Sequence, residues 1–209
     1  FDRVKKITES AGPVPAIEEF AGNEKVFIAG SSWEDDEKII TGYINRNPGR
    51  MKWIFAPHEV NEGHIGRLMK MLKVSSVRLS EYTTAHASAR VLIIDTVGLL
   101  SSSYRYAYIA AVGGGFGKGI HNILEAACWG VPVLFGPNHS KFREAADLMK
   151  LNGAWCFADY EQFAEIMELL LNNSSIYENS SAESAGYVIR NAGASEKIAE
   201  FCFNKVVNN

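Results

Sequence analysis

The sequence has little of several features that would define its class at once. Of its 209 residues three are cysteine and six are proline, and its formal net charge is −3. The three cysteines (Cys128, Cys156 and Cys202) lack the paired spacing of a metal site, and an odd number of scattered thiols is typical of a reducing compartment. No apolar run reaches the ~18 residues that a membrane span needs. The absence of a basic excess argues against nucleic acid as a partner.

The first residues, Phe1-Asp2-Arg3, contain neither an initiating methionine nor a signal-peptide pattern. We therefore expect the chain to be a fragment of a longer protein. At 47% hydrophobic residues, 209 residues are enough for one well-packed domain and short for two. We expect 1–24 to be a linker or entry segment and 25–209 to form one domain.

The sequence does contain a regular alternation of apolar strands with helices of about 10–15 residues. Continuous apolar runs predict strands at 25–29, 52–56, 90–95, 108–112 and 131–135, with shorter ones at 76–80 and 154–157. Helices are predicted at 16–20, 141–151, 161–171 and 182–207. Three more are predicted to begin at 34, at 99 and at 120–121, and a further one follows the strand at 52–56 and ends at about 72. This alternation predicts an α/β fold with a doubly wound parallel sheet and helices on both faces.

The most informative stretch covers residues 110–127, A-A-V-G-G-G-F-G-K-G-I-H-N-I-L-E-A-A. An apolar strand leads into a glycine-rich turn, and a helix is predicted to open at 120–121. Such a turn presents backbone N–H groups to an anion, and glycine lets the backbone approach a ligand closely. The helix start would add up to ~2 kcal/mol toward an anion in a partly buried site.

Three polar residues follow this turn. On a helix, His121 and Glu125 (four apart) and Asn122 and Glu125 (three apart) would share one face. The carboxylate could then accept hydrogen bonds from two ribose hydroxyls, with a phosphate at the helix start. A helix N-terminus with ordinary polar residues gives a similar pattern, but H-N-x-x-E favours a nucleotide site. The glycine spacing is not that of the dinucleotide fingerprint.

Polar residues also follow three other predicted strands, and ligands collect at the carboxyl ends of strands in open α/β sheets. Gly30-Ser31-Ser32 is a second candidate anion cradle, although either serine could equally be a helix cap. His58 follows the next strand. A histidine in such a loop is more often solvated than in contact with a ligand. Asp95 and Thr96 could touch a ligand, with capping of the following helix the favoured alternative.

Together these motifs resemble the C-terminal, donor-binding half of a two-domain glycosyltransferase of the GT-B type. Within that type they are most similar to the 3-deoxy-D-manno-octulosonic acid (Kdo) transferases of lipopolysaccharide synthesis. The specific part of the signature is G-x-H-N-x-L-E-A-A followed by G-x-P-V-x-x-G-P, within residues 119–137. The weaker parts are Gly30-Ser31-Ser32, Ala56-Pro57-His58, Asp95-Thr96-Val97-Gly98 and Gly113-Gly114-Gly115-Phe116.

The resemblance implies a Rossmann-like sheet and makes 25–209 a nucleotide-sugar binding domain. It implies CMP-Kdo as donor substrate, with no cofactor and no metal. The donor site that it implies consists of Gly30, Ser31, Ser32, His58, Thr96, Gly113, Gly114, Gly115, Phe116, Gly119, His121, Asn122, Ile123, Leu124 and Glu125. Lys118 could add charge to a phosphate, but a flexible exposed lysine is the simpler interpretation.

The resemblance also implies functions that this chain does not carry. An absent N-terminal domain would bind the lipid A precursor, contact the membrane and supply the carboxylate base, so the catalytic residue is unknown here. The full-length protein would lie at the cytoplasmic face of the inner membrane, and this fragment would be soluble and inactive alone. Two departures weaken the loop contacts: no arginine stands beside His58, and Leu99 follows Gly98 where the family often has G-E-L.

Two alternatives remain open. A GT-B glycosyltransferase that uses a UDP-sugar shares the glycine turn and a ribose-binding glutamate. A non-catalytic nucleotide-sugar-binding domain fits the lack of an acid/base pair in this sequence. A dehydrogenase fits least, because the glycine pattern is wrong for a dinucleotide.

Overall fold

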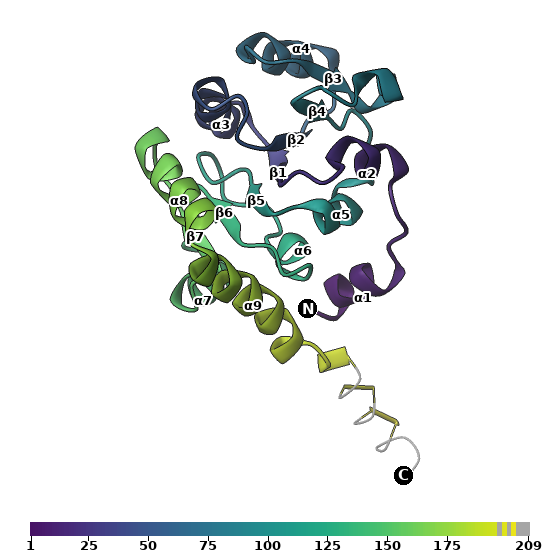
Figure 1. Ribbon diagram of the computed structural model, residues 1–209. Helices are drawn as coiled ribbons and strands as arrows, with labels where there is room; N and C mark the ends of the chain where they lie inside the picture. The colour runs from purple at the N-terminus through teal and green to yellow at the C-terminus, as the bar shows by residue number, and fades with distance from the viewer. Residues whose placement is uncertain (196–197, 200–201, 204–209) are drawn as a thin grey trace.

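The computed structural model describes residues 1–195, 198–199 and 202–203 (Figure 1). Seven strands form one sheet in the order β3-β4-β2-β1-β5-β6-β7, and every neighbouring pair is parallel. The strands are β1 (Val26–Ser32), β2 (Lys52–Pro57), β3 (Ser76–Arg78), β4 (Val91–Ile93), β5 (Ile109–Val112), β6 (Val133–Phe135) and β7 (Ala154–Cys156). The predicted parallel sheet is therefore confirmed.

Helices alternate with these strands in the described part of the chain. They are α1 (Asp2–Ser10), α2 (Pro15–Ala21), α3 (Glu34–Arg46), α4 (Glu62–Met71), α5 (Leu100–Ser103), α6 (Leu124–Ala127), α7 (Arg143–Lys150), α8 (Tyr160–Asn172) and α9 (Ser174–Asn191), with 3-10 turns η1 (Leu79–Glu81), η2 (Thr84–His86) and η3 (Tyr104–Tyr106). The helix predicted at 182–207 begins earlier, as α9, and ends at Asn191. Its predicted continuation over 196–197, 200–201 and 204–207 lies outside the described residues.

The sheet carries an apolar core on each face, because successive side chains of a strand point to opposite sides. In β1, Val26 and Ile28 pack into one cluster, whereas Phe27 and Ala29 pack into the other. Buried side chains of α3, α4 and α8 cover the second cluster, and those of α1, α2, α6, α7 and α9 cover the first (Figure 1). Helices on both faces make the sheet doubly wound.

The first 24 residues take part in this packing. Val4 of α1 and Ile17 and Phe20 of α2 are buried in the first cluster. The sequence predicted a short helix at 16–20 and no helix at 2–10. The segment therefore covers one face of the sheet, and the domain boundary drawn after residue 24 stays a prediction.

The order of the strands reverses at the centre of the sheet. The chain moves outward from β1 through β2 on one side and from β5 through β6 on the other. Loops that leave β1 and β5 therefore diverge, and the crevice between them at the carboxyl ends is where open α/β sheets bind ligands. The amide of Gly113 donates to the carbonyl of Gly30 across this point (N···O 2.9 Å).

Among the helices that the structure describes, none combines the length and apolar character needed to span a membrane.

The centre of the sheet gives a first prediction, for Gly30→Ala. A Cβ at Gly30 would overlap the hydroxyl of Tyr104, which is itself buried. We expect the free energy of unfolding to fall by about 1–3 kcal/mol, the cost of overpacking a core, measured by urea denaturation. Gly49→Ala is the control, since a Cβ at Gly49 has nothing within 4 Å. Equal urea midpoints for the two variants would contradict the close packing at Gly30.

Candidate donor-binding site

The segment after β5 does not become a helix where the sequence predicted one. His121 and Asn122 lie in irregular backbone, and α6 begins only at Leu124 and has four residues. The prediction of a helix opening at 120–121, and of one helical face shared by His121, Asn122 and Glu125, is wrong. The backbone folds back first, because Gly119 has a positive φ (135°) and the amide of His121 donates to the carbonyl of Gly113.

This correction removes part of the predicted anion site. A helix of four residues has little macrodipole, so the stabilisation expected from a helix start does not apply. Asn122 acts as a local cap instead, since its Oδ1 accepts the amide of Leu124 (3.1 Å). Anion binding must therefore come from the glycine turn itself.

The glycine turn uses most of its amides internally. Hydrogen bonds within the protein are donated by the amides of Gly113, Gly114, Gly117 and Gly119. Within the described residues, the amides of Phe116 and Lys118 donate to no partner, and both residues line a cavity of about 550 Å³. The amide of Gly115 also has no partner among the described residues, but Gly115 does not line the cavity. The amides of Phe116 and Lys118 are therefore the ones that could bind an anion there.

Glycines in the turn also meet a packing requirement. A Cβ at Gly113 would overlap the carbonyl oxygen of Ser31, and one at Gly115 would overlap the backbone of Gly136. The loops after β1, β5 and β6 therefore lie backbone against backbone. Gly113 and Gly115, which the sequence predicted as donor contacts, do not line this cavity.

The 550 Å³ cavity is closed on its other side by the loop after β1 and the start of α3. Asp36 lies there, 3% exposed, and its Oδ2 accepts the amides of Trp33 (3.0 Å) and Gly114 (3.1 Å). Burial raises the pKa of Asp36 to about 6, against the opposing effect of these two hydrogen bonds. One carboxylate thus joins the loops that follow β1 and β5.

Asp36 was missed in the sequence, and the predicted serine cap is wrong. Trp33 is the residue before α3, and the carboxylate three positions later accepts its amide, as in a capping box. The acidic start of the helix was the available signal. It could not show which of four consecutive acids, 34–37, turns inward.

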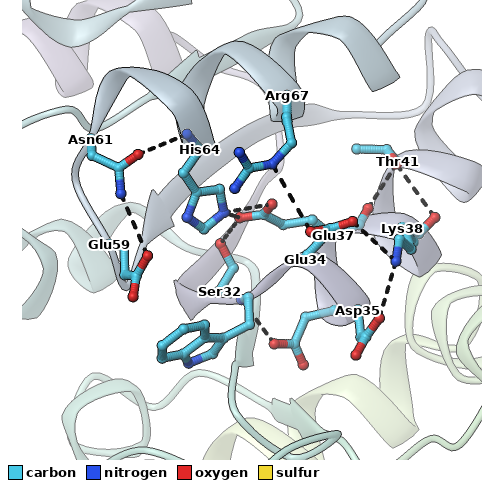
Figure 2. Close-up of polar contacts among 12 residues, drawn as sticks. Ser32, Glu34, Asp35, Glu37, Lys38, Thr41, Glu59, Asn61, His64 and Arg67 are labelled. Carbon is cyan, nitrogen blue, oxygen red and sulfur yellow. Dashed lines mark hydrogen bonds and ion pairs between the residues drawn. The ribbon is translucent and has the colours of Figure 1, made fainter.

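Ser32 is buried and points away from the cavities. Its Oγ donates to Oε1 of Glu37 (2.7 Å), and Glu37 is also 2.9 Å from Nε2 of His64 on α4 (Figure 2). Asn61 begins α4 by accepting the amide of His64 (2.9 Å). This network fixes the loop after β1 against α4, so Ser32 supports the site and does not line it.

A second cavity, of about 140 Å³, lies over the carboxyl ends of β1, β2 and β4. Ser31, His58 and Thr96 line it, so the structure brings together three residues that the sequence predicted separately. Ser31 sits at an irregularity in the β1–β2 pairing and has a positive φ (49°). Asp95 does not cap α5 and does not line this cavity, and its carboxylate accepts the amide and hydroxyl of Ser80.

Three aromatic rings lie between the two cavities. Nε1 of Trp33 donates to Nε2 of His121 (3.1 Å), and the two rings are nearly coplanar, at 11°. His58 stacks on both, with centroids 4.6 Å from Trp33 and 4.3 Å from His121. Burial, and then the neighbouring His58, lower the pKa of His121. We call Trp33, His58 and His121 the ring stack.

Glu125 lies beside α5. Its carboxylate accepts hydrogen bonds from the hydroxyl of Ser101 and from Nδ2 of Asn122 (3.1 Å for the latter). A carboxylate has about four acceptor positions, so two of them are still available. Glu125 is half-buried and lines neither cavity.

The predicted site residues therefore fall into three groups. Lining the larger cavity are Gly114, Phe116, Gly119 and His121. Lining the smaller one are Ser31, His58 and Thr96. Lining neither are Gly30, Ser32, Gly113, Gly115, Asn122, Ile123, Leu124 and Glu125, and of these Ile123 and Leu124 are buried in the apolar core.

Comparisons with known proteins place this geometry in a class. The 3-deoxy-D-manno-octulosonic acid transferase of Aquifex aeolicus is 34% identical over 131 residues, which are 61% of this chain and 36% of that protein. The chain thus spans about a third of that relative's length. No family model matches the sequence.

Solved structures share the fold at low sequence identity. The C-terminal CMP-Kdo binding domain of WaaA from Acinetobacter baumannii has a TM-score of 0.70 at 21% identity, over 89% of this chain and 98% of that one. Anabaena HepE in complex with UDP-glucose has a TM-score of 0.64 at 12% identity, over 92% of this chain and 54% of that one.

The parallel sheet and the crevice at its centre are those of a GT-B-type glycosyltransferase domain. The chain is related in sequence to the Kdo transferases, and it shares the fold of the C-terminal domain of one of them. The resemblance predicted from the motifs is confirmed.

The buried carboxylate gives a second prediction, for Asp36→Asn. An aspartate has a pKa near 4 when unfolded, and that of Asp36 is about 6 when folded. Protonated Asp36 therefore stabilises the fold below about pH 4, and this contribution is lost as the pH rises through about 6. The asparagine variant lacks this loss of stability. The difference in Tm, variant minus wild type, should therefore increase as the pH is raised from about 4 to about 7.

Asp35→Asn is the control for this measurement, because Asp35 is the exposed neighbour on the same helix. Its Tm difference from wild type should stay constant over the same pH range. If both variants show the same pH dependence in calorimetry, Asp36 is not the titrating group.

Proposed function

We propose that this chain is the donor-binding domain of a Kdo transferase, which transfers Kdo from CMP-Kdo to a lipid A precursor. The observation that carries the proposal is the crevice at the ends of β1 and β5, together with 34% identity to a Kdo transferase over 131 residues. The likeness to a domain described as binding CMP-Kdo supports the choice of donor.

We assign the two cavities to the two parts of this donor. The smaller cavity, beside Ser31 and Thr96, takes the base of the nucleoside. The ribose lies outside this cavity, where its hydroxyls donate to Glu125. The larger cavity takes the sugar, whose hydroxyls can donate to the carboxylates of Glu34 and Asp35 on its wall. The phosphate then lies between them, beside the ring stack.

The chemistry of the leaving group fits this arrangement. As the bond to Kdo breaks, negative charge grows on the phosphate of CMP. Amides fixed in advance stabilise such charge without reorganisation, and the amides of Phe116 and Lys118 are in the right loop. The Lys118 ammonium adds a positive charge. For this reason we expect transfer to need neither a metal nor a cofactor.

The remaining functions are assigned to a second domain. We propose that this acceptor domain binds the lipid A precursor, contacts the cytoplasmic face of the inner membrane and supplies the carboxylate base. The proposal follows from the family resemblance and from the chain's covering about a third of its relative.

A UDP-sugar is the second candidate donor. The likeness to a protein in complex with UDP-glucose supports it, because the same fold holds both nucleotides. The base is read by the loops after β2 and β4, and the first of these lacks the arginine often found in Kdo transferases.

The third prediction tests the donor directly. We expect the purified chain to bind CMP more tightly than UMP in calorimetry, and to transfer no Kdo from CMP-Kdo to a lipid acceptor. Tighter binding of UMP would favour the UDP-sugar alternative. Measurable turnover by the chain alone would refute the need for a second domain.

The fourth prediction concerns Glu125→Ala. Ribose hydroxyls that lose their acceptor should weaken CMP binding by about 1–3 kcal/mol, or roughly 5- to 150-fold in Kd. Glu161→Ala is the control, because Glu161 is exposed on α8. An unchanged Kd in a folded Glu125 variant would show that this carboxylate only holds Ser101 and Asn122.

A further inference from the structure

The hydrogen bond inside the ring stack fixes where the proton of His121 lies. An indole N–H can only donate, so Nε2 of His121 must be the acceptor and carries no proton. A neutral imidazole with an unprotonated Nε2 carries its proton on Nδ1. The geometry therefore selects one of the two neutral tautomers.

The backbone beside each of the two bonded rings, Trp33 and His121, donates a hydrogen bond to the same carboxylate. Asp36 accepts the amide of Trp33 (3.0 Å) and also that of Gly114 (3.1 Å). Gly114 lies directly beside the imidazole, since a Cβ there would be 3.1 Å from Cδ2 of His121. A Cβ at 114 would overlap the carbonyl oxygen of Gly119, so only glycine lets the backbone lie this close to the imidazole. The Trp33–His121 pair is thus built into the crevice.

The charges around His121 are of both signs. His58 stacks on it, and the larger cavity that it lines also contains Glu34, Asp35, Asp36 and Lys118. Protonation at Nε2 would place a second N–H against the indole N–H and break the bond. Burial and His58 act in the same direction by lowering the pKa of His121.

We propose that Trp33 is a positioning residue that holds His121 in the neutral Nδ1–H tautomer. His121 then offers an uncharged hydrogen-bond donor to an anionic oxygen, phosphate or carboxylate, of a ligand in the crevice. Among the described residues, Nδ1 of His121 has no partner, so this donor is available. The proposal rests on the proposed function for its ligand, but the tautomer is a property of the protein alone.

Trp33→Phe is the variant that tests this role. Phenylalanine keeps a six-membered aromatic ring against His58 and removes the N–H together with the five-membered ring of the indole. Imidazole nitrogen shifts of the ¹⁵N-histidine-labelled chain report the tautomer, with His121→Gln for assignment. In wild type we expect Nδ1 protonated and Nε2 bare near pH 7; in the variant we expect the Nε2–H form to dominate and the pKa of His121 to rise.

Trp155→Phe is the matched control, because its indole donates to Ser180 (3.2 Å) at the far edge of the sheet. It should leave the His121 signals unchanged. A wild-type His121 protonated at Nε2, or signals identical in wild type and the Trp33 variant, would overturn the proposal. The wild-type spectrum decides this even if the variant does not fold.

Binding of CMP gives the functional readout. We compare the Kd for CMP of the Trp33→Phe variant with that of wild type. The titration of CMP itself affects both values equally and does not change their ratio, variant over wild type. We expect this ratio to fall severalfold from about pH 8 to about pH 6, because His121 becomes a cation only in the variant. A constant ratio would show that Trp33 does not act through protonation. If CMP binds neither protein, the proposed function fails, and the nitrogen shifts still decide the tautomer.

Discussion

One buried carboxylate connects the two loops that border the crevice at the centre of the sheet. Asp36 accepts the amides of Trp33 and Gly114, and so connects the loops after β1 and β5. These loops would otherwise diverge, because the strand order reverses between them. Burying this carboxyl group is unfavourable, as its raised pKa shows, and the two amides offset part of that cost. The larger cavity lies between the loops that this bridge connects.

The bridge also limits how the crevice can bind an anion. It uses the Gly114 amide, and other amides of the glycine turn bond to the turn's own carbonyls. Of the described residues that line the two cavities, Lys118 alone carries a permanent positive charge. Neutral donors (two amides and the Nδ1–H of His121) therefore make up most of the anion-binding groups. A site of this kind fits a phosphate monoester better than the longer and more highly charged pyrophosphate.

The relation to Kdo transferases agrees with this polarity. With the proposed donor, CMP would leave with a single phosphate group, whereas a nucleoside diphosphate would bring two. Where the family often has an arginine beside the loop histidine, this chain has Pro57 and places His58 on the Trp33–His121 pair. Contacts between flat rings take the place of an arginine there. Specificity then depends on shape and hydrogen-bond direction more than on net charge.

The sequence by itself determined that the sheet is parallel and covered by helices on both faces, because continuous apolar strands alternating with helices favour burial on both sides. It also determined the family, through short motifs such as H-N-x-x-E, and it named seven of the residues that line the two cavities. It could not give the length of α6, because positive φ at Gly119 and packing against other loops delay that helix. Nor could it separate Ser31, in a cavity, from Ser32, bonded to Glu37. Asp36 and the ring stack were decided by tertiary structure alone, since their partners come from strands far apart in sequence that only the folded sheet brings to one edge.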